Sequence, residues 1–402
     1  MLRRDHARVL MYSHDTFGLG HLRRCREIAH ALVERFKGLQ VLIVSGSSIA
    51  GAYDFRARVD FIKIPSVIKL YSGEYTSLAQ HIDLSETLAM RRAIIQQTAD
   101  LYRPNLFIVD KEPLGLKGEL EQTLVLLKSR GTALVLGLRE VLDSPEQVRA
   151  DWQRSDTMRK IEALYDAVWI YGCPGFWDPM TGLDVPKPVK SRITFTGHLR
   201  RNFPRFPSAG SLDLPEEFIL VTAGGGGDGG PLMQQVLAAR ECDRSLDFPL
   251  VMILGPFMAA DQREEIRERA RRLPNITVRD FESQIEAIMM RASAIVSMGG
   301  YNTFCEILSF DKRALLVPRC RPRREQLIRA TRAAELGLVD VLDPSAAADP
   351  KVMAEALRRL PERPLPSSLQ GRINLDGLET VCDAVGDYIN NVPCPLPAYA
   401  AM

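Results

Sequence analysis

The chain has 402 residues, of which 46% are hydrophobic and 25% charged, as in a globular protein large enough for two domains. The formal net charge of +2 provides no protein-wide field that would attract nucleic acid, so we expect no nucleic-acid partner. Seven scattered cysteines without a CxxC pair indicate neither a zinc site nor a disulfide framework, and favour reduced thiols in the cytoplasm. No apolar run is long enough for a signal peptide or a membrane span, although peripheral contact with the inner face of the membrane stays open.

Short apolar runs alternate with helical patterns along the first half of the chain. Residues 9–13 and 41–45 are expected to be buried strands, and between them apolar residues recur at helical spacing from Leu22 to Phe36. This order predicts a β-α-β unit, with a parallel sheet and a right-handed crossover. We expect further strands at 61–64, 106–109, 133–136 and 167–170, and helices near 84–101 and 116–128.

A segment rich in Pro, Arg, Ser and Gly interrupts the alternation at 197–214 and is typical of an interdomain linker. The alternation then restarts, with strands expected at 218–222, 250–254, 276–278, 294–297 and 314–317, and helices at 232–242, 262–272, 284–292, 301–309, 324–336 and 351–360. We therefore predict an α/β protein with two Rossmann-like, doubly wound parallel-sheet domains that face a cleft. The domains are expected at 1–198 and 215–362, joined by a linker at 199–214. A final segment at 363–402, with a helix near 375–388, is expected to pack back on the N-terminal domain.

The first strand-to-helix turn reads HDTFGLGHLRRC and is the first candidate site. Gly18 and Gly20 permit a tight turn and the close approach of a ligand, at the sheet edge where α/β proteins bind ligands. His21 opens the following helix, whose dipole disfavours the protonated imidazole and leaves it available as a base. A glycine turn with a solvated histidine is the alternative. Arg23 and Arg24 could contact a ligand or face solvent.

The second candidate is the glycine run at 223–230, which follows the strand FILVT. Its consecutive N–H groups could form a concavity for phosphate, and the lack of GK[ST] excludes a P-loop. We expect six glycines in eight positions to serve a ligand rather than packing, with a flexible loop as the alternative. The expected phosphate contacts are Gly224, Gly225, Gly226 and Gly227.

The third candidate is the glycine pair after the strand AIVS, at the start of a helix that carries a glutamate. Bare N–H groups at such a helix start can bind phosphate, and a carboxylate one to two turns further can accept hydrogen bonds from sugar hydroxyls. Asn302 and Glu306 are four residues apart and share one helix face. A surface glutamate on an amphipathic helix is the alternative. The candidate residues are Gly299, Gly300, Tyr301, Asn302, Thr303 and Glu306.

Two further segments carry polar residues at strand ends. The turn RCRPRREQ could hold phosphate through its arginines or be solvated, and Gln326 can both donate to and accept from a sugar hydroxyl. Its candidates are Arg324, Glu325 and Gln326.

Asp110 and Glu112 follow the strand LFIVD at the same sheet edge as the first turn. Either carboxylate could orient the histidine base or contact an acceptor, with a helix N-cap as the alternative.

Together these motifs resemble the two-domain GT-B glycosyltransferases, and within them family 28, which includes the N-acetylglucosaminyltransferase that forms lipid II. The family has GA-L-T-x-x-E on a helix, then a strand ending in V-P and a turn ending in Q-Q. This chain matches the pattern at Thr303, Glu306, Pro318 and Gln326, with Glu325 at the first Q. The turn before Gly118 differs from the lipid II enzyme, so we expect another acceptor. The matches in the N-terminal turn are Gly18, Gly20 and His21.

The resemblance implies an inverting glycosyltransferase of the hexosyltransferase class that uses a nucleotide-diphosphate sugar, expected to be UDP-linked, as donor. It implies that Glu306 binds the ribose hydroxyls, Gln326 the donor sugar, and the glycine run at 224–227 and the helix start at 300–301 the diphosphate. His21 would be the base, oriented by Asp110 or Glu112, with a small-molecule, glycan or lipid-linked acceptor. The absence of a DxD motif agrees with a reaction that needs neither a metal nor another cofactor.

Alternatives stay open at this point. The turn GLGHLRRC also resembles the GxGHxxRC of nucleotide-sugar hydrolases in the pseudaminic acid pathway, where the same histidine acts on water. A non-catalytic nucleotide-sugar-binding protein is a third interpretation. A GT-B epimerase is expected to carry further acidic residues, which we do not find. The oligomeric state cannot be read from the sequence.

Overall fold

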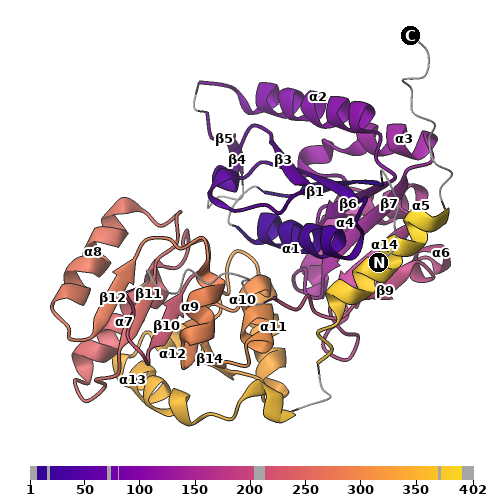
Figure 1. Ribbon diagram of the computed structural model, residues 1–402. Coiled ribbons are helices and arrows are strands. Elements are labelled where there is room, and N and C mark those ends of the chain that lie inside the picture. Colours follow the sequence, from indigo (N-terminus) through magenta and orange to yellow (C-terminus); the bar gives the residue numbers. More distant parts are fainter. Residues whose placement is uncertain are drawn as a thin grey trace.

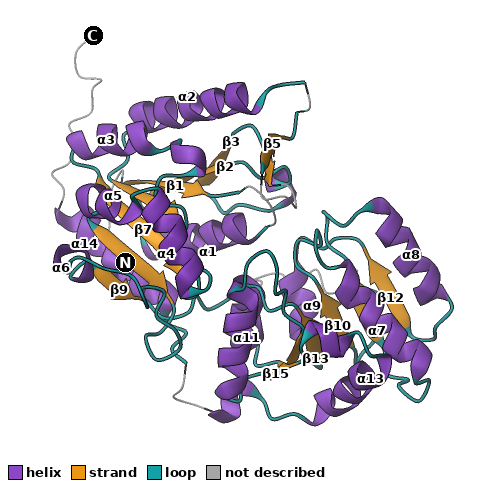
Figure 2. Ribbon diagram, turned by 180° about the vertical axis from the view of Figure 1, so that it is seen from behind, coloured by secondary structure: helices purple, strands orange, loops and turns teal. Residues whose placement is uncertain are grey.

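A computed structural model describes residues 7–15, 19–69, 74–79, 81–202, 213–369 and 373–391. It contains two α/β domains, each built on a parallel sheet with helices on both faces, which confirms the predicted fold class (Figures 1 and 2). Part of the first candidate turn, including Gly18, and most of the expected linker lie outside the described residues.

The N-terminal sheet has the strand order β3-β2-β1-β6-β7-β8-β9. Near-continuous apolar runs form these strands because helices cover both faces of a parallel sheet. The strands are β1 (Arg8–Ser13), β2 (Gln40–Ser45), β3 (Val59–Lys63), β6 (Leu106–Asp110), β7 (Ala133–Arg139), β8 (Ala167–Tyr171) and β9 (Ile193–Phe195). The helices are α1 (Gly20–Arg35), α2 (Leu84–Tyr102), α3 (Glu121–Ser129), α4 (Pro145–Arg154), α5 (Thr157–Leu164) and α6 (Lys187–Lys190). A short hairpin, β4 (Val67–Lys69) and β5 (Tyr75–Ser77), lies outside the main sheet.

The C-terminal sheet has the strand order β12-β11-β10-β13-β14-β15. Its strands are β10 (Ile219–Thr222), β11 (Leu250–Ile253), β12 (Ile276–Arg279), β13 (Ala294–Ser297), β14 (Arg313–Leu316) and β15 (Asp340–Val341). Its helices are α7 (Gly230–Cys242), α8 (Ala260–Arg271), α9 (Ile285–Arg291), α10 (Tyr301–Ser309), α11 (Glu325–Glu335), α12 (Pro344–Ala347) and α13 (Pro350–Arg359).

The prediction of one helix over 116–128 is wrong. Residues Leu116–Gly118 form a short 3-10 turn, and α3 begins only at Glu121. Three residues in this turn or directly before it have positive φ, which a right-handed helix does not accommodate. They are Gly115 at 68°, Lys117 at 51° and Gly118 at 77°.

The C-terminal segment crosses from one domain to the other (Figure 1). Arg363 still belongs to the C-terminal domain, since it donates hydrogen bonds to the carbonyl groups of Gly337 and Leu338. The last helix, α14 (Gly377–Asn391), instead packs against α1. Its apolar side chains join the N-terminal core, and these are Leu378, Val381, Cys382, Val385 and Ile389. None of the helices in the described part of the chain has the length and apolar character needed to cross a bilayer.

Candidate active site between the two domains

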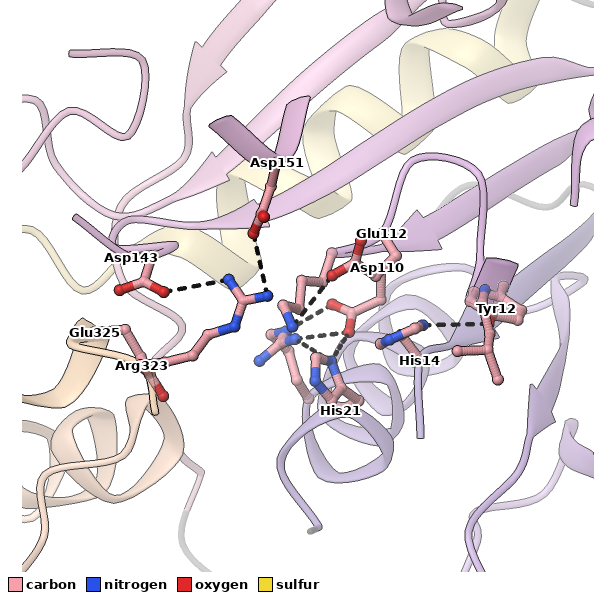
Figure 3. A network of polar contacts seen from close by, with 12 residues as sticks. Tyr12, His14, His21, Asp110, Glu112, Asp143, Asp151, Arg323 and Glu325 are labelled. Carbon is pink, nitrogen blue, oxygen red and sulfur yellow. Dashed lines mark hydrogen bonds and ion pairs between the residues drawn. The ribbon is translucent and has the colours of Figure 1, made fainter. Parts of the chain in front are cut away.

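His21 lies at the carboxyl edge of the N-terminal sheet, beside the end of β6. Strands β1 and β6 are parallel neighbours, so the start of α1 and Asp110 meet at the same edge. The His21 Nδ1 lies 2.5 Å from Asp110 Oδ2 (Figure 3). Arg24, one turn further along α1, donates to both carboxylate oxygens of Asp110 at 2.7 and 2.6 Å. Asp110 therefore orients His21, whereas Glu112 contacts Lys111 at 3.3 Å instead.

Electrostatics favour a neutral His21 next to an ionised Asp110. Burial lowers the pKa of His21 to about 4, although Asp110 acts in the opposite direction. Burial alone would raise the pKa of Asp110, but Arg24 and His21 hold it below its usual range. With Nδ1–H donating to Asp110, Nε2 carries the free lone pair. The side chain of His21 is 13% exposed, so a ligand can reach it.

The two arginines of the first turn are buried, which excludes the solvated alternative for both. Arg23 crosses to the C-terminal domain and donates to Glu286 at 2.7 Å and to Glu306 at 2.6 Å. Arg24 also lies 5.5 Å from the ring centre of Tyr301. The first turn thus contacts both the catalytic candidates and α10.

Glu306 is not a surface glutamate, because its side chain is 1% exposed. Its Oε1 accepts from Arg23, while Oε2 is buried without a hydrogen-bond partner. Asn302 lies on the same face of α10 and donates to the Gly20 carbonyl at 2.9 Å. The predicted ribose-binding face of α10 therefore packs against α1 in this structure. The phenol oxygen of Tyr301 accepts a hydrogen bond from the Leu199 N–H at 3.3 Å. The group of Tyr301 that could bind a phosphate is therefore its own backbone N–H.

The two glycines before α10 differ from one another. Gly299 has a φ of 73°, and an added Cβ would meet Leu316 at 3.0 Å. Gly300 has an ordinary φ of −59°, and an added Cβ would meet nothing within 4 Å. Neither backbone conformation nor packing explains the glycine at 300, so the space in front of it is available to a ligand.

Packing explains several glycines of the 223–230 run, contrary to the prediction. A Cβ on Gly226 would lie 2.3 Å from the Leu254 carbonyl oxygen, and one on Gly229 would lie 2.0 Å from the Cβ of Ala223. Gly224 has a φ of 64° but open space around it. The side of the loop at Gly224 is therefore the part that a phosphate can approach.

Ion pairs hold two arginines of the RCRPRREQ turn, whereas Arg321 and Arg324 are exposed. Arg319 pairs with Glu325 and, at 2.7 Å, with Asp228 of the glycine-rich loop. Gln326 Oε1 accepts from the Arg319 N–H at 3.0 Å. Arg323 reaches Asp143 and Asp151 of the N-terminal domain at 3.2 and 3.4 Å (Figure 3). The structure thus brings the five predicted segments to two facing sheet edges.

One buried contact between the domains was not predicted from the sequence. Arg329 on α11 pairs with Glu140, just after β7, and both side chains are fully buried. Arg324, expected to bind the donor, contacts Asp143 through its backbone N–H at 2.8 Å. Among the described residues, His, Cys, Asp and Glu form no group of three or more that could hold a metal ion.

Comparison with known proteins agrees with this architecture. Residues 218–366 match the glycosyltransferase family 28 C-terminal domain. A crystal structure of the kitacinnamycin glycotransferase is 18% identical, with a TM-score of 0.63, over 96% of this chain and 99% of that one. The glycosyltransferase VinC in complex with dTDP is 19% identical, with a TM-score of 0.59, over 95% and 98%. MurG of Acinetobacter baumannii is 14% identical, with a TM-score of 0.56, over 95% and 100%. No curated protein matches the sequence.

Proposed function

Since the chain has the GT-B fold and its residues 218–366 match the C-terminal domain of glycosyltransferase family 28, we propose that it is an inverting glycosyltransferase of the hexosyltransferase class. It transfers a sugar from a nucleotide-diphosphate donor to the hydroxyl of an acceptor. The observation that carries this proposal is the contact between His21 and Asp110, which keeps a neutral base at the sheet edge that faces the C-terminal domain. The candidate site residues named in the sequence analysis are included in this proposal.

His21 acts as the general base. Its Nε2 removes the hydroxyl proton as the acceptor oxygen attacks the anomeric carbon from the face opposite the diphosphate. The new glycosidic bond forms while the bond from the anomeric carbon to the diphosphate oxygen breaks. The products are an inverted glycoside, a nucleoside diphosphate and a proton on His21. Asp110 stabilises the imidazolium that forms.

The donor lies on the C-terminal domain. The open space at Gly300 and at Gly224 suits the diphosphate, whose developing charge is stabilised by backbone N–H groups without a metal ion. Glu306 takes the ribose hydroxyls, and Gln326 the sugar. The complex of VinC with dTDP supports a nucleoside diphosphate here. We propose that the donor is a UDP-linked sugar. We propose the cytoplasm as the compartment, either at the membrane surface or away from it.

The test combines binding with product analysis. Calorimetry against UDP- and dTDP-sugars should identify one donor that binds, and mass spectrometry should then detect a glycoside only when an acceptor is present. Free sugar released rapidly without any acceptor would establish the nucleotide-sugar hydrolase instead. Binding without any product over a broad acceptor set would support a non-catalytic protein.

A further inference from the structure

The charged side chains at the two facing sheet edges lie in ion pairs, some within one domain and others between the domains. Arg319 and Arg323 each contact two carboxylates. The pairs are Arg24 with Asp110, Lys111 with Glu112, Arg319 with Glu325, Arg323 with Asp143, and Arg329 with Glu140.

Arg139 is the exception at this edge. It is the last residue of β7, and its Nε is buried without a hydrogen-bond partner. No carboxylate in the described part of the chain forms an ion pair with its guanidinium. The neighbouring Glu140 is taken by Arg329. A partly buried cation without a counter-ion is unfavourable unless a ligand supplies the anion.

The strand geometry places Arg139 on the face of the sheet that α1 covers. Side chains alternate along β7, so Arg139 lies on the same face of the sheet as Val135. Val135 belongs to the apolar cluster that packs under α1, the helix that carries His21 and Arg24. Asp110 pairs in register with Gly137, so Arg139 lies two residues further toward the carboxyl end of the strands.

The charge of Arg139 persists at neutral pH. Burial lowers its pKa to about 10, and the attraction of Glu325 only partly offsets this. Arg329 and Arg24 act on the pKa of Arg139 in the same direction as burial, whereas Glu140 acts with Glu325 in the opposite direction. Arg139 therefore keeps a positive charge that no carboxylate of the described residues pairs with.

We propose that Arg139 binds an anionic group of the acceptor, a carboxylate or a phosphate, and thereby places the acceptor hydroxyl at His21. The inference rests on the proposed function and narrows its acceptor to an anionic class. Arg139 belongs to the N-terminal sheet edge that carries the base, whereas the glycine turns for the donor belong to the C-terminal domain. A guanidinium can hold either group through two parallel hydrogen bonds.

The first experiment measures anion binding without turnover. Inorganic phosphate is titrated by calorimetry into the enzyme saturated with UDP, so that the donor cradle is already filled. The variants are Arg139→Gln, Arg139→Lys and a control, Arg154→Gln, whose side chain is 76% exposed on α4. We expect about a tenfold or greater loss of phosphate affinity in Arg139→Gln, a smaller loss in Arg139→Lys and none in the control.

The second experiment compares acceptors that differ only in a carboxylate or its carboxamide. The wild type should prefer the anionic member in KM, and Arg139→Gln should lose this preference. Equal phosphate binding in wild type and Arg139→Gln, or no preference in the wild type, would overturn the inference. An equal loss of UDP affinity in Arg139→Gln would assign the arginine to the donor diphosphate instead. If the enzyme binds no nucleotide, the result counts against the proposed function. Phosphate titrated without UDP would then still test the role of Arg139.

Discussion

The catalytic candidates show how a single residue depends on its neighbours. Asp110 was expected at the end of a strand, and the apolar run LFIV was enough to place it there. Its partner Arg24 could not be assigned, because an arginine on the first turns of a helix usually faces solvent. Burial of Arg24 follows from the tertiary contact with β6, to which no local sequence pattern points.

Replacement of His21 tests the base directly. We expect His21→Ala to lower turnover by about 10²–10⁴-fold, because it removes general base catalysis. Donor affinity should change little, since the donor contacts the other domain. His81→Ala, at an exposed histidine, is the control. Full turnover in His21→Ala would require another base, and Glu112 would be the next candidate.

The pH dependence of the wild type follows from the same residue. Only the neutral imidazole can accept a proton, and burial lowers the pKa of His21 to about 4. The rate should therefore hold down to mildly acidic pH and fall as the pH decreases through about 4. This acidic limb should be missing from the residual activity of His21→Ala. A limb near the ordinary value for histidine would show that the site is more hydrated than the structure indicates.

At the scale of elements, Arg23 of α1 and the donor compete for the Glu306 carboxylate of α10. Donor binding through Glu306 must displace Arg23, which can remain paired with Glu286. Arg23→Gln should therefore raise donor affinity several-fold, whereas Glu306→Ala should weaken it by about 1.5–3 kcal/mol. Arg35→Gln, at an exposed pair on the far end of α1, is the control for calorimetry. If Arg23→Gln and Glu306→Ala both weaken donor binding, Arg23 is part of the donor site.

The start of α10 offers a sharper test. Gly300→Ala should leave stability unchanged, because the backbone is ordinary and the added methyl group meets no atom. If the diphosphate approaches here, the same methyl group should lower nucleotide-sugar affinity about tenfold or more. Gly51→Ala, where an added Cβ also meets nothing, controls for a general effect in thermal unfolding and in binding. Unchanged affinity in Gly300→Ala would remove this turn from the donor site.

The same glycine turns predict catalysis without a metal ion. Backbone N–H groups carry the negative charge of the leaving diphosphate in this proposal, so no cation has to bridge its oxygens. Turnover should survive excess EDTA, with a known metal-dependent enzyme as the positive control for chelation. Loss of activity that magnesium or manganese restores would contradict the prediction.

Elements with a clear apolar period could be predicted from the sequence, and those without one could not. The central strands are buried on both faces, so their apolar runs were evident. Helix α4 was missed because only Val148 of its ten residues is buried, although Ser144 and Pro145 form a recognisable N-terminal cap. The expected helix at 116–128 failed at positive φ, which Lys117 adopts without any signal in its sequence.

At the scale of the whole molecule, the two domains are joined by ion pairs that connect distant parts of the chain. The Nε of Arg329 donates to Glu140 at 2.5 Å, and its Nη1 donates to the Gly299 carbonyl at 3.3 Å. Arg329 therefore links the N-terminal sheet edge to the donor turn before α10. Sequence alone could not pair residues 189 positions apart.

Replacement of Glu140 tests how much this ion pair contributes to stability and to donor binding. Glu140→Ala leaves Arg329 charged and buried without a counter-ion, which typically costs about 3–5 kcal/mol. We expect a lower midpoint in chemical unfolding and weaker donor binding, because the Gly299 carbonyl loses its rigid support. The double variant Glu140→Gln with Arg329→Met removes both charges, so it should recover most of the stability but not the support of the donor turn. If the double variant is as unstable as Glu140→Ala, lost packing rather than the unpaired charge would explain the effect, and the pair would not be the electrostatic link between the two domains.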